Sequence, residues 1–218
     1  MAYKAVLFDM DGTVLDTLDD LTDAVNYSLE RFGLPRVSRE HARANLGNGA
    51  AYLVRHCLPQ GTDQGRTEEL IAFYRAYYDA HCRVRTGPYA GILPLMARLK
   101  AAGIRQAIIS NKPDPAVQEL AAHFFPGLLE TAVGESPAVR RKPNPDAVLR
   151  AVEQMGLEKA DCVYVGDTEV DLQTAKNAGL DCIAVTWGFR DEEQLLAAGA
   201  EKLAHSAAEL EALLLEQK

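Results

Sequence analysis

Two carboxylates stand where the first apolar stretch of the chain ends. Asp9 directly follows the run Ala5–Phe8, and Asp11 lies two residues further along the chain. An apolar run this short is typical of a strand buried on both faces of a parallel sheet, and ligands of such sheets bind outside the carboxyl ends of the strands. Two acids this close repel each other unless a cation or a shared proton lies between them. The alternative is that both residues only form a turn, because Asp-Gly is a common turn pair.

Three later segments offer matching chemistry and favour a functional site. They carry a hydroxyl, an amide, an ammonium and two further carboxylates, namely Ser110, Asn111, Lys142, Asp167 and Asp171. If they follow strands of one doubly wound sheet, they converge with Asp9 and Asp11 at one edge. Several carboxylates without histidine partners are typical of a hard-cation site, for which Mg²⁺ fits best. Mg²⁺ with a lysine and hydroxyl donors is suited to phosphoryl transfer.

The strands and helices that would position these residues alternate along the chain. The sequence predicts strands over residues 5–8, 104–109, 129–133, 162–165, 182–185 and 203–205. It predicts helices over residues 18–32, 41–46, 50–57, 67–83, 91–102, 114–123, 146–155 and 169–178, and a last helix that begins with the capping box Ser206/Glu209. This alternation predicts an α/β fold with a doubly wound, Rossmann-like parallel sheet.

One long stretch has helical periodicity and no strand pattern. We therefore predict a helical cap domain over residues 16–86, inserted into a core domain of residues 1–15 and 87–218. The loop around Gly47-Asn48-Gly49 is the expected contact with the leaving group. Several conspicuous side chains are expected only to begin a helix or to pack: Asp16, Asp19, Asp20, Tyr74, Tyr77, Tyr78 and Trp187.

Composition narrows the class of protein. The chain has 218 residues, 48% hydrophobic and 25% charged, as in ordinary soluble globular proteins. A net charge of −8 argues against a nucleic-acid partner, and no apolar run is long enough to span a membrane. Four scattered cysteines fit a reduced compartment, and few residues precede the first strand. We therefore expect a cytoplasmic protein, monomer or homodimer, with a small phosphorylated metabolite as its partner.

Taken together, the motifs resemble those of a known family. In order and setting, Asp9-x-Asp11-Gly-Thr, Ser110, Lys142 and Gly-Asp167-x-x-x-Asp171 resemble the four motifs of the haloacid dehalogenase-like phosphohydrolases. The resemblance covers the whole chain. Within that superfamily, the segments around residues 110–112, 141–145 and 166–168 look most like those of phosphoglycolate phosphatases.

The resemblance implies a covalent mechanism. Asp9 would attack phosphorus and form an aspartyl-phosphate. Asp11 would protonate the leaving alcohol and then deprotonate the water that hydrolyses the intermediate. Mg²⁺ would be held by the Asp9 carboxylate, the Asp11 backbone carbonyl and Asp167, with Asp171 as a more distant or water-mediated ligand. The implied phosphate contacts are Ser110, Asn111 and Lys142.

Other activities stay open at this point. 2-Phosphoglycolate is the substrate that the resemblance favours, but a pyrophosphatase, a nucleotidase or a sugar-phosphate phosphatase of the same superfamily fits the same motifs. A haloacid dehalogenase is disfavoured because it needs no acid at the position of Asp11. A signalling receiver domain would be far shorter, and a non-catalytic phosphometabolite-binding protein would be expected to lack the nucleophile or the acid.

Overall fold

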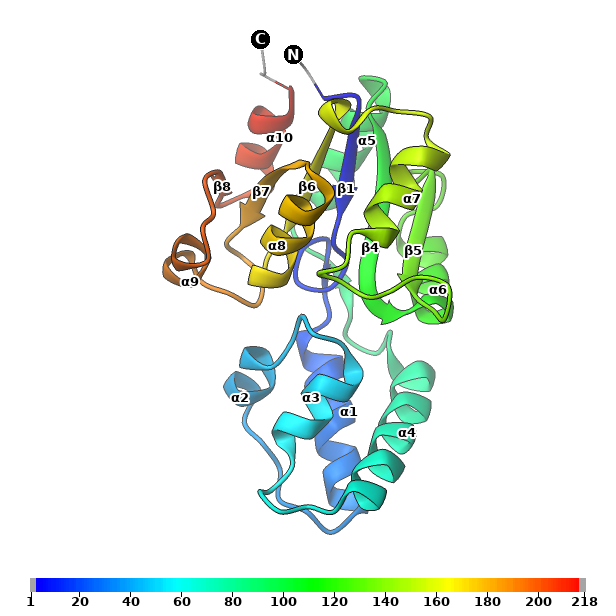
Figure 1. Ribbon diagram of the computed structural model, residues 1–218, viewed down its shortest axis with the longest axis vertical. Helices are drawn as coiled ribbons and strands as arrows, with labels where there is room; N and C mark the ends of the chain where they lie inside the picture. The colour runs from blue at the N-terminus through cyan, green and yellow to red at the C-terminus, as the bar shows by residue number, and fades with distance from the viewer. Residues whose placement is uncertain (1–2, 216–218) are drawn as a thin grey trace.

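A six-stranded parallel sheet forms the centre of the computed structural model, which describes residues 3–215. The strands lie in the order β5-β4-β1-β6-β7-β8 (Figure 1). Their bounds are β1 Ala5–Phe8, β4 Arg105–Pro113, β5 Thr131–Glu135, β6 Cys162–Gly166, β7 Asp181–Val185 and β8 Leu203–Ala204. The predicted α/β fold with a doubly wound parallel sheet is confirmed.

Alternating side chains of the central strand explain why helices cover both faces. Val6 and Phe8 belong to one buried apolar cluster, with residues of α5, α6 and α10. Ala5 and Leu7 belong to a second cluster, with residues of α7 and α8. These helices are α5 Ile92–Ala101, α6 Asp114–Phe124, α7 Asp146–Gln154, α8 Glu169–Ala178 and α10 Ala207–Leu215. A strand with apolar side chains on both faces must be covered on both, as the predicted pattern requires.

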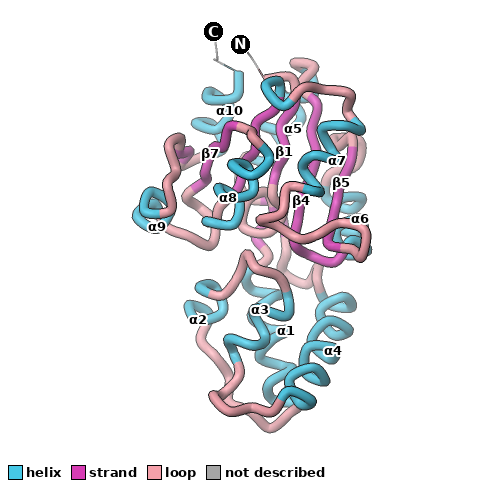
Figure 2. The backbone as a smooth tube through the Cα atoms, in the orientation of Figure 1, coloured by secondary structure: helices cyan, strands magenta, loops and turns pink. Residues whose placement is uncertain are grey.

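Four helices lie apart from the sheet, beyond the carboxyl ends of its strands (Figures 1 and 2). They are α1 Leu18–Arg31, α2 Arg39–Ala44, α3 Ala50–Cys57 and α4 Gln64–His81, and we call residues 18–81 the four-helix segment. All four helices were expected from the sequence. The division into a core and a cap domain at residues 16 and 86 stays a prediction.

The chain passes between the sheet and the four-helix segment at two places that lie side by side. A short antiparallel pair, β2 Leu15–Asp16 and β3 Gly87–Pro88, joins them. The buried carboxylate of Asp20 accepts hydrogen bonds from the backbone N–H groups of Arg85 and Thr86 and from the Thr86 hydroxyl. Asp20 was expected only to begin a helix; this expectation was wrong, because its carboxylate ties the two connections together.

Two further elements differ from the prediction. β4 does not end at Ile109 but continues through Pro113, because it pairs with β5 again at Glu135 after a shift in register. A six-residue helix, α9 Glu192–Ala197, was not predicted. Within residues 3–215, no helix has the length and apolar character needed to cross a membrane. Met1 and Ala2, two of the few residues that precede the first strand, lie outside the described residues.

Candidate active site

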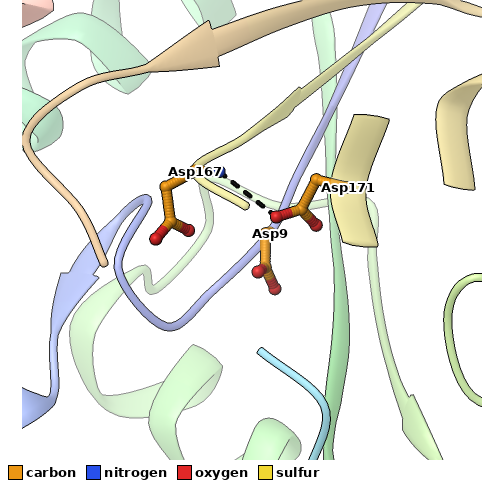
Figure 3. A group of neighbouring side chains, drawn as sticks. All are labelled: Asp9, Asp167 and Asp171. Atoms are coloured by element: carbon orange, nitrogen blue, oxygen red, sulfur yellow. Dashed lines mark hydrogen bonds between the residues drawn. The ribbon is translucent and has the colours of Figure 1, made fainter. Parts of the chain in front are cut away.

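The carboxyl ends of two neighbouring strands, and the helix that follows one of them, bring the expected acidic residues together. β1 lies between β4 and β6, and Asp9 and Asp167 follow β1 and β6 directly. Asp171 lies in the first turn of α8. Carboxylate oxygens of these three residues lie within 4.8 Å of one another, and all three side chains are buried (Figure 3). Residues from distant parts of the chain therefore meet where the parallel sheet predicts.

One ammonium lies among these carboxylates. Lys142 Nζ is 2.9 Å from Asp9 Oδ1 and 2.7 Å from Asp171 Oδ1. It also donates a hydrogen bond of 3.1 Å to the Tyr164 hydroxyl. Lys142 is only 4% exposed, so water cannot screen these contacts. The lysine is thus held against the side chain that was expected to act as nucleophile.

Asp171 has both of its oxygens occupied by protein groups. Oδ1 binds Lys142, and Oδ2 accepts hydrogen bonds from the Thr168 hydroxyl at 2.7 Å and from the backbone N–H groups of Thr168 and Asp167. The Thr168 and Asp171 contacts form a capping box at the start of α8. Asp171 is therefore placed to position Lys142 and the loop of Asp167, consistent with the more distant role expected of it.

Asp167 is fixed by groups from two other loops. Its Oδ1 accepts a hydrogen bond of 2.8 Å from the Thr13 hydroxyl, and its Oδ2 accepts one of 2.7 Å from the backbone N–H of Phe189. Gly12 and Gly188 pack directly on this carboxylate, and a Cβ at either position would clash with it. Gly12 also has a φ of +83°, which favours glycine. Both glycines are needed for the loops to approach Asp167.

Burial of so many acids shifts their protonation. Burial raises the pKa of Asp9 well above its usual range, with Asp171 adding to the effect. Burial and Asp171 raise the pKa of Asp167 to about 7. Burial alone would lower the pKa of Lys142, but Asp171 and Asp9 outweigh it and raise that pKa well above its usual range. Ionisation of all three acids leaves two negative charges unbalanced by Lys142, which is the charge of one divalent cation. The carboxylate oxygens therefore fit a hard cation such as Mg²⁺.

Ser110 and Asn111 lie beside this group, near the end of β4. Ser110 Oγ accepts a hydrogen bond from the backbone N–H of Lys112, and among residues 3–215 no acceptor takes its own hydrogen. Asn111 accepts a hydrogen bond from the Lys142 backbone N–H at 2.7 Å and donates to the carbonyls of Lys142 and Gly47. The amide of Asn111 thus has both of its N–H groups in use, and its contacts position the loop that carries Lys142.

Asp11 makes a contact that the motif did not indicate. Its Oδ1 lies 3.1 Å from Lys112 Nζ as an ion pair. Lys112 in turn donates a hydrogen bond of 2.6 Å to the hydroxyl of Tyr78, which comes from α4 of the four-helix segment. Tyr78 was expected only to pack; it is buried but also reaches the site. Neither side chain could have been found by spacing alone, since 34 residues separate them.

A cavity of about 60 Å³, partly open to solvent, lies over these groups. Its walls combine strand ends with the four-helix segment, and they include Asp9, Asp11, Ser110, Lys112, Lys142, Leu21, Leu46, Gly47, Gly49, Leu53, Tyr74 and Tyr78. The loop Leu46–Gly49 was expected to face the substrate, and the structure places it on the cavity wall. Most of the wall supplied by the four-helix segment is apolar, but Arg75 and Asp79 of α4 add two charged side chains to it.

Comparisons with known proteins agree with this geometry. The family model described as haloacid dehalogenase-like hydrolase matches residues 6–185. Phosphoglycolate phosphatase 1 of Pseudomonas aeruginosa is 36% identical over 85% of this chain and 70% of that protein. N-acetylmuramic acid 6-phosphate phosphatase of the same organism is 32% identical, over 87% of this chain and 84% of that protein. A structure from Lactobacillus delbrueckii subsp. bulgaricus, assigned as a phosphoglycolate phosphatase, covers both chains fully with 37% identity and a TM-score of 0.95.

Proposed function

Since this chain belongs to the haloacid dehalogenase-like hydrolases, we propose that it is a Mg²⁺-dependent phosphomonoesterase that forms an aspartyl-phosphate on Asp9. The observation that carries the proposal is the contact of Asp9 with Lys142 inside a buried group of carboxylates. A carboxylate held beside a fixed positive charge can meet an anionic phosphate, which an acidic surface would otherwise repel.

The proposed reaction has two steps. An Asp9 carboxylate oxygen attacks phosphorus, the bond to the leaving oxygen breaks, and Asp11 gives that oxygen a proton. Asp11 then takes a proton from a water molecule, the water oxygen attacks the same phosphorus, and inorganic phosphate leaves Asp9 as a carboxylate. Lys142 stays paired with negative charge throughout, since it contacts Asp9 at 2.9 Å before the reaction.

Other contacts of the site would bind the metal ion and the phosphoryl oxygens. The Asp9 carboxylate, the Asp11 backbone carbonyl and Asp167 would hold Mg²⁺, which when bound stabilises negative charge on the phosphoryl oxygens. We propose that Ser110 donates its free hydroxyl hydrogen to a phosphoryl oxygen. The sequence assigned Asn111 the same task, but its hydrogen bonds favour a role in positioning Lys142.

We propose 2-phosphoglycolate as the first substrate to test, because relatives with that activity in their names match most of this chain. The N-acetylmuramic acid 6-phosphate phosphatase among the relatives makes a sugar phosphate the second candidate. The four-helix segment would act as a cap that excludes water during the reaction. We expect the protein to work in the cytoplasm.

The deciding experiment measures phosphate release with Mg²⁺ from 2-phosphoglycolate, sugar phosphates, nucleotides and pyrophosphate. The proposal predicts turnover of at least one monoester, and its loss in Asp9→Asn. Release of phosphate by Asp9→Asn at the native rate would contradict the mechanism. Preference for pyrophosphate or nucleotides would retain the chemistry and replace the substrate.

A further inference from the structure

Lys112 is a buried ammonium that the proposed reaction does not use. It is 6% exposed and comes from the last part of β4. Its Nζ lies 3.1 Å from Asp11 Oδ1, donates a hydrogen bond of 2.6 Å to the Tyr78 hydroxyl, and lies 4.3 Å from the centre of the Tyr78 ring. Burying an ammonium is costly unless its partners are well placed. The Lys112 ammonium is therefore fixed by several buried contacts, unlike the ammonium of a solvent-exposed ion pair.

Asp11 has little else to fix its carboxylate. Within the described residues 3–215, its buried Oδ1 accepts no hydrogen bond of good geometry, so the ion pair with Lys112 is the interaction that orients it. Asp9, by contrast, is held by Lys142 and by the Met10 backbone N–H. A proton donor must point at the leaving oxygen within hydrogen-bond distance, so a loosely held Asp11 would transfer its proton poorly.

Tyr78 links this arrangement to the four-helix segment. Its side chain is 4% exposed and lies on α4, whereas Lys112 and Asp11 lie on strand ends of the sheet. The hydroxyl that fixes Lys112 is thus supplied across the cavity by the element that covers the site. A substrate can be enclosed and the proton donor oriented by the same contact.

We propose that Lys112, held by Tyr78, is a positioning residue that aims the Asp11 carboxyl at the leaving oxygen. The inference rests on the proposed function, because it concerns proton transfer in that reaction. When the ester bond to phosphorus breaks, the electron pair goes to the leaving oxygen and the proton comes from Asp11. An alkoxide needs that proton, whereas a nitrophenolate can leave without it. Lys112 should therefore matter for alkyl phosphates and little for p-nitrophenyl phosphate.

The test compares kcat/KM for three substrates in the native protein and in Lys112→Met and Tyr78→Phe. The substrates are p-nitrophenyl phosphate, 2-phosphoglycolate and an alkyl phosphate without a second charge that the native protein hydrolyses, such as ethyl phosphate. kcat/KM reports the steps up to formation of the phosphorylated enzyme, so dephosphorylation does not obscure the comparison.

The chain contains a matched control. Tyr3, Lys202 and Asp181 form a similar tyrosine–lysine–aspartate group, with Lys202 Nζ 3.3 Å from both the Tyr3 hydroxyl and Asp181 Oδ2. Asp181 begins β7, at the opposite end of the parallel strands from the site. Lys202→Met and Tyr3→Phe should leave kcat/KM unchanged for all three substrates.

The expected result is a leaving-group effect. Lys112→Met should lower kcat/KM for both alkyl phosphates by about 10²-fold and for p-nitrophenyl phosphate by less than about threefold. Tyr78→Phe removes one hydroxyl, and should lower the alkyl values by about tenfold with the same selectivity.

Three results would overturn the inference. They are an equal loss on all substrates, a loss confined to 2-phosphoglycolate, which would make Lys112 a ligand of the carboxylate, and no loss in either variant. Tyr78→Phe gives the answer if Lys112→Met fails to fold. The proposed function itself fails separately, if the native protein hydrolyses none of the substrates.

Discussion

At the scale of residues, Lys142 determines how the site holds its charge. Its ammonium bridges Asp9 and Asp171, both of which are buried. Removing one partner of a buried ion pair leaves an uncompensated charge, which costs far more than the loss of an exposed pair. The same side chain would neutralise the phosphate, so stability and activity should depend on it together.

Lys142→Met should therefore lower both the stability and the activity of the protein. We expect the free energy of unfolding, measured in urea at neutral pH without metal, to fall by about 3–5 kcal/mol. Phosphate release should fall by about 10²-fold or more, because the charge beside the nucleophile is lost. Arg140→Met is the control: Arg140 is exposed, pairs with Asp146, and should change stability by less than about 0.5 kcal/mol. Equal effects of the two variants would refute this account of Lys142.

The sequence was sufficient to predict the acids at this scale but not their partners. Spacing identified Asp9 and Asp167 because both follow apolar strands directly. The Thr13 hydroxyl that binds Asp167 lies 154 residues away from it, so only the folded sheet shows that contact. Lys112 lay in one of the segments that carried the family resemblance but was given no role, since a polar side chain after a predicted strand is usually exposed.

At the scale of elements, the loop after β7 limits the space around Asp167. Gly188 packs against the Asp167 carboxylate and the Gly12 carbonyl. The neighbouring Phe189 backbone N–H donates to the same carboxylate. The loops after β1, β6 and β7 thus meet on one side chain, and any methyl group placed between them must push it away.

Gly188→Ala should weaken Mg²⁺ binding by about 10–100-fold, the range typical of changes next to metal ligands. Calorimetric titration of the metal-free protein with Mg²⁺ measures this affinity directly. Gly87→Ala is the control, because a Cβ there has nothing within 4 Å and should leave affinity unchanged. If both variants bound Mg²⁺ like the native protein, Asp167 would not be a ligand.

The connection between the sheet and the four-helix segment depends on Asp20. Asp20→Asn replaces one acceptor oxygen by an N–H₂ group, so some of the bonds from Arg85 and Thr86 must break. We expect a loss of about 2–3 kcal/mol, or roughly 4–12 °C in melting temperature for a chain of this size. Asp19→Asn affects only exposed pairs with Arg39 and Arg85 and should cost less than about 1 kcal/mol. A melting temperature unchanged in Asp20→Asn would show that the two connections are held by other contacts.

Helices were easier to predict than the ends of strands. α3 and α8 have the predicted bounds because glycines or a capping threonine flank clear helical periods. β4 extends four residues beyond its predicted end at Ile109. Ser110 to Pro113 show no apolar alternation, and only their pairing with β5 extends the strand. α9 was missed although Asp191 and Gln194 form a capping box, a signal that the sequence does contain.

At the scale of the whole molecule, the buried acids couple stability to pH and to metal. The pKa of Asp167 is raised to about 7, and that of Asp9 is raised as well. An acid with a raised pKa binds its proton more tightly in the folded protein, so its contribution to stability is present at low pH and is lost as the pH rises through the folded pKa.

The metal-free protein should therefore become less stable between about pH 5 and pH 8. A loss of about 2 kcal/mol would lower the melting temperature by about 4–8 °C. Mg²⁺ binds the ionised acids, so it should raise the melting temperature more at pH 8 than at pH 5. Differential scanning calorimetry with EDTA or Mg²⁺ checks both trends. The opposite slope, or equal stabilisation by Mg²⁺ at both pH values, would mean that these acids do not control stability.

The covalent step on Asp9 is the central claim, and mass spectrometry of the Asp11→Asn variant tests it most directly. p-Nitrophenyl phosphate needs no acid for its leaving group, so this variant should become phosphorylated and then hydrolyse the intermediate slowly. Acid quenching after mixing with substrate and Mg²⁺ should show one added phosphoryl group, which borohydride reduction and peptide mapping locate on Asp9. The same treatment of Asp9→Asn should show none. A phosphoryl group on another residue, or release of nitrophenol at the native rate with no adduct, would contradict the account.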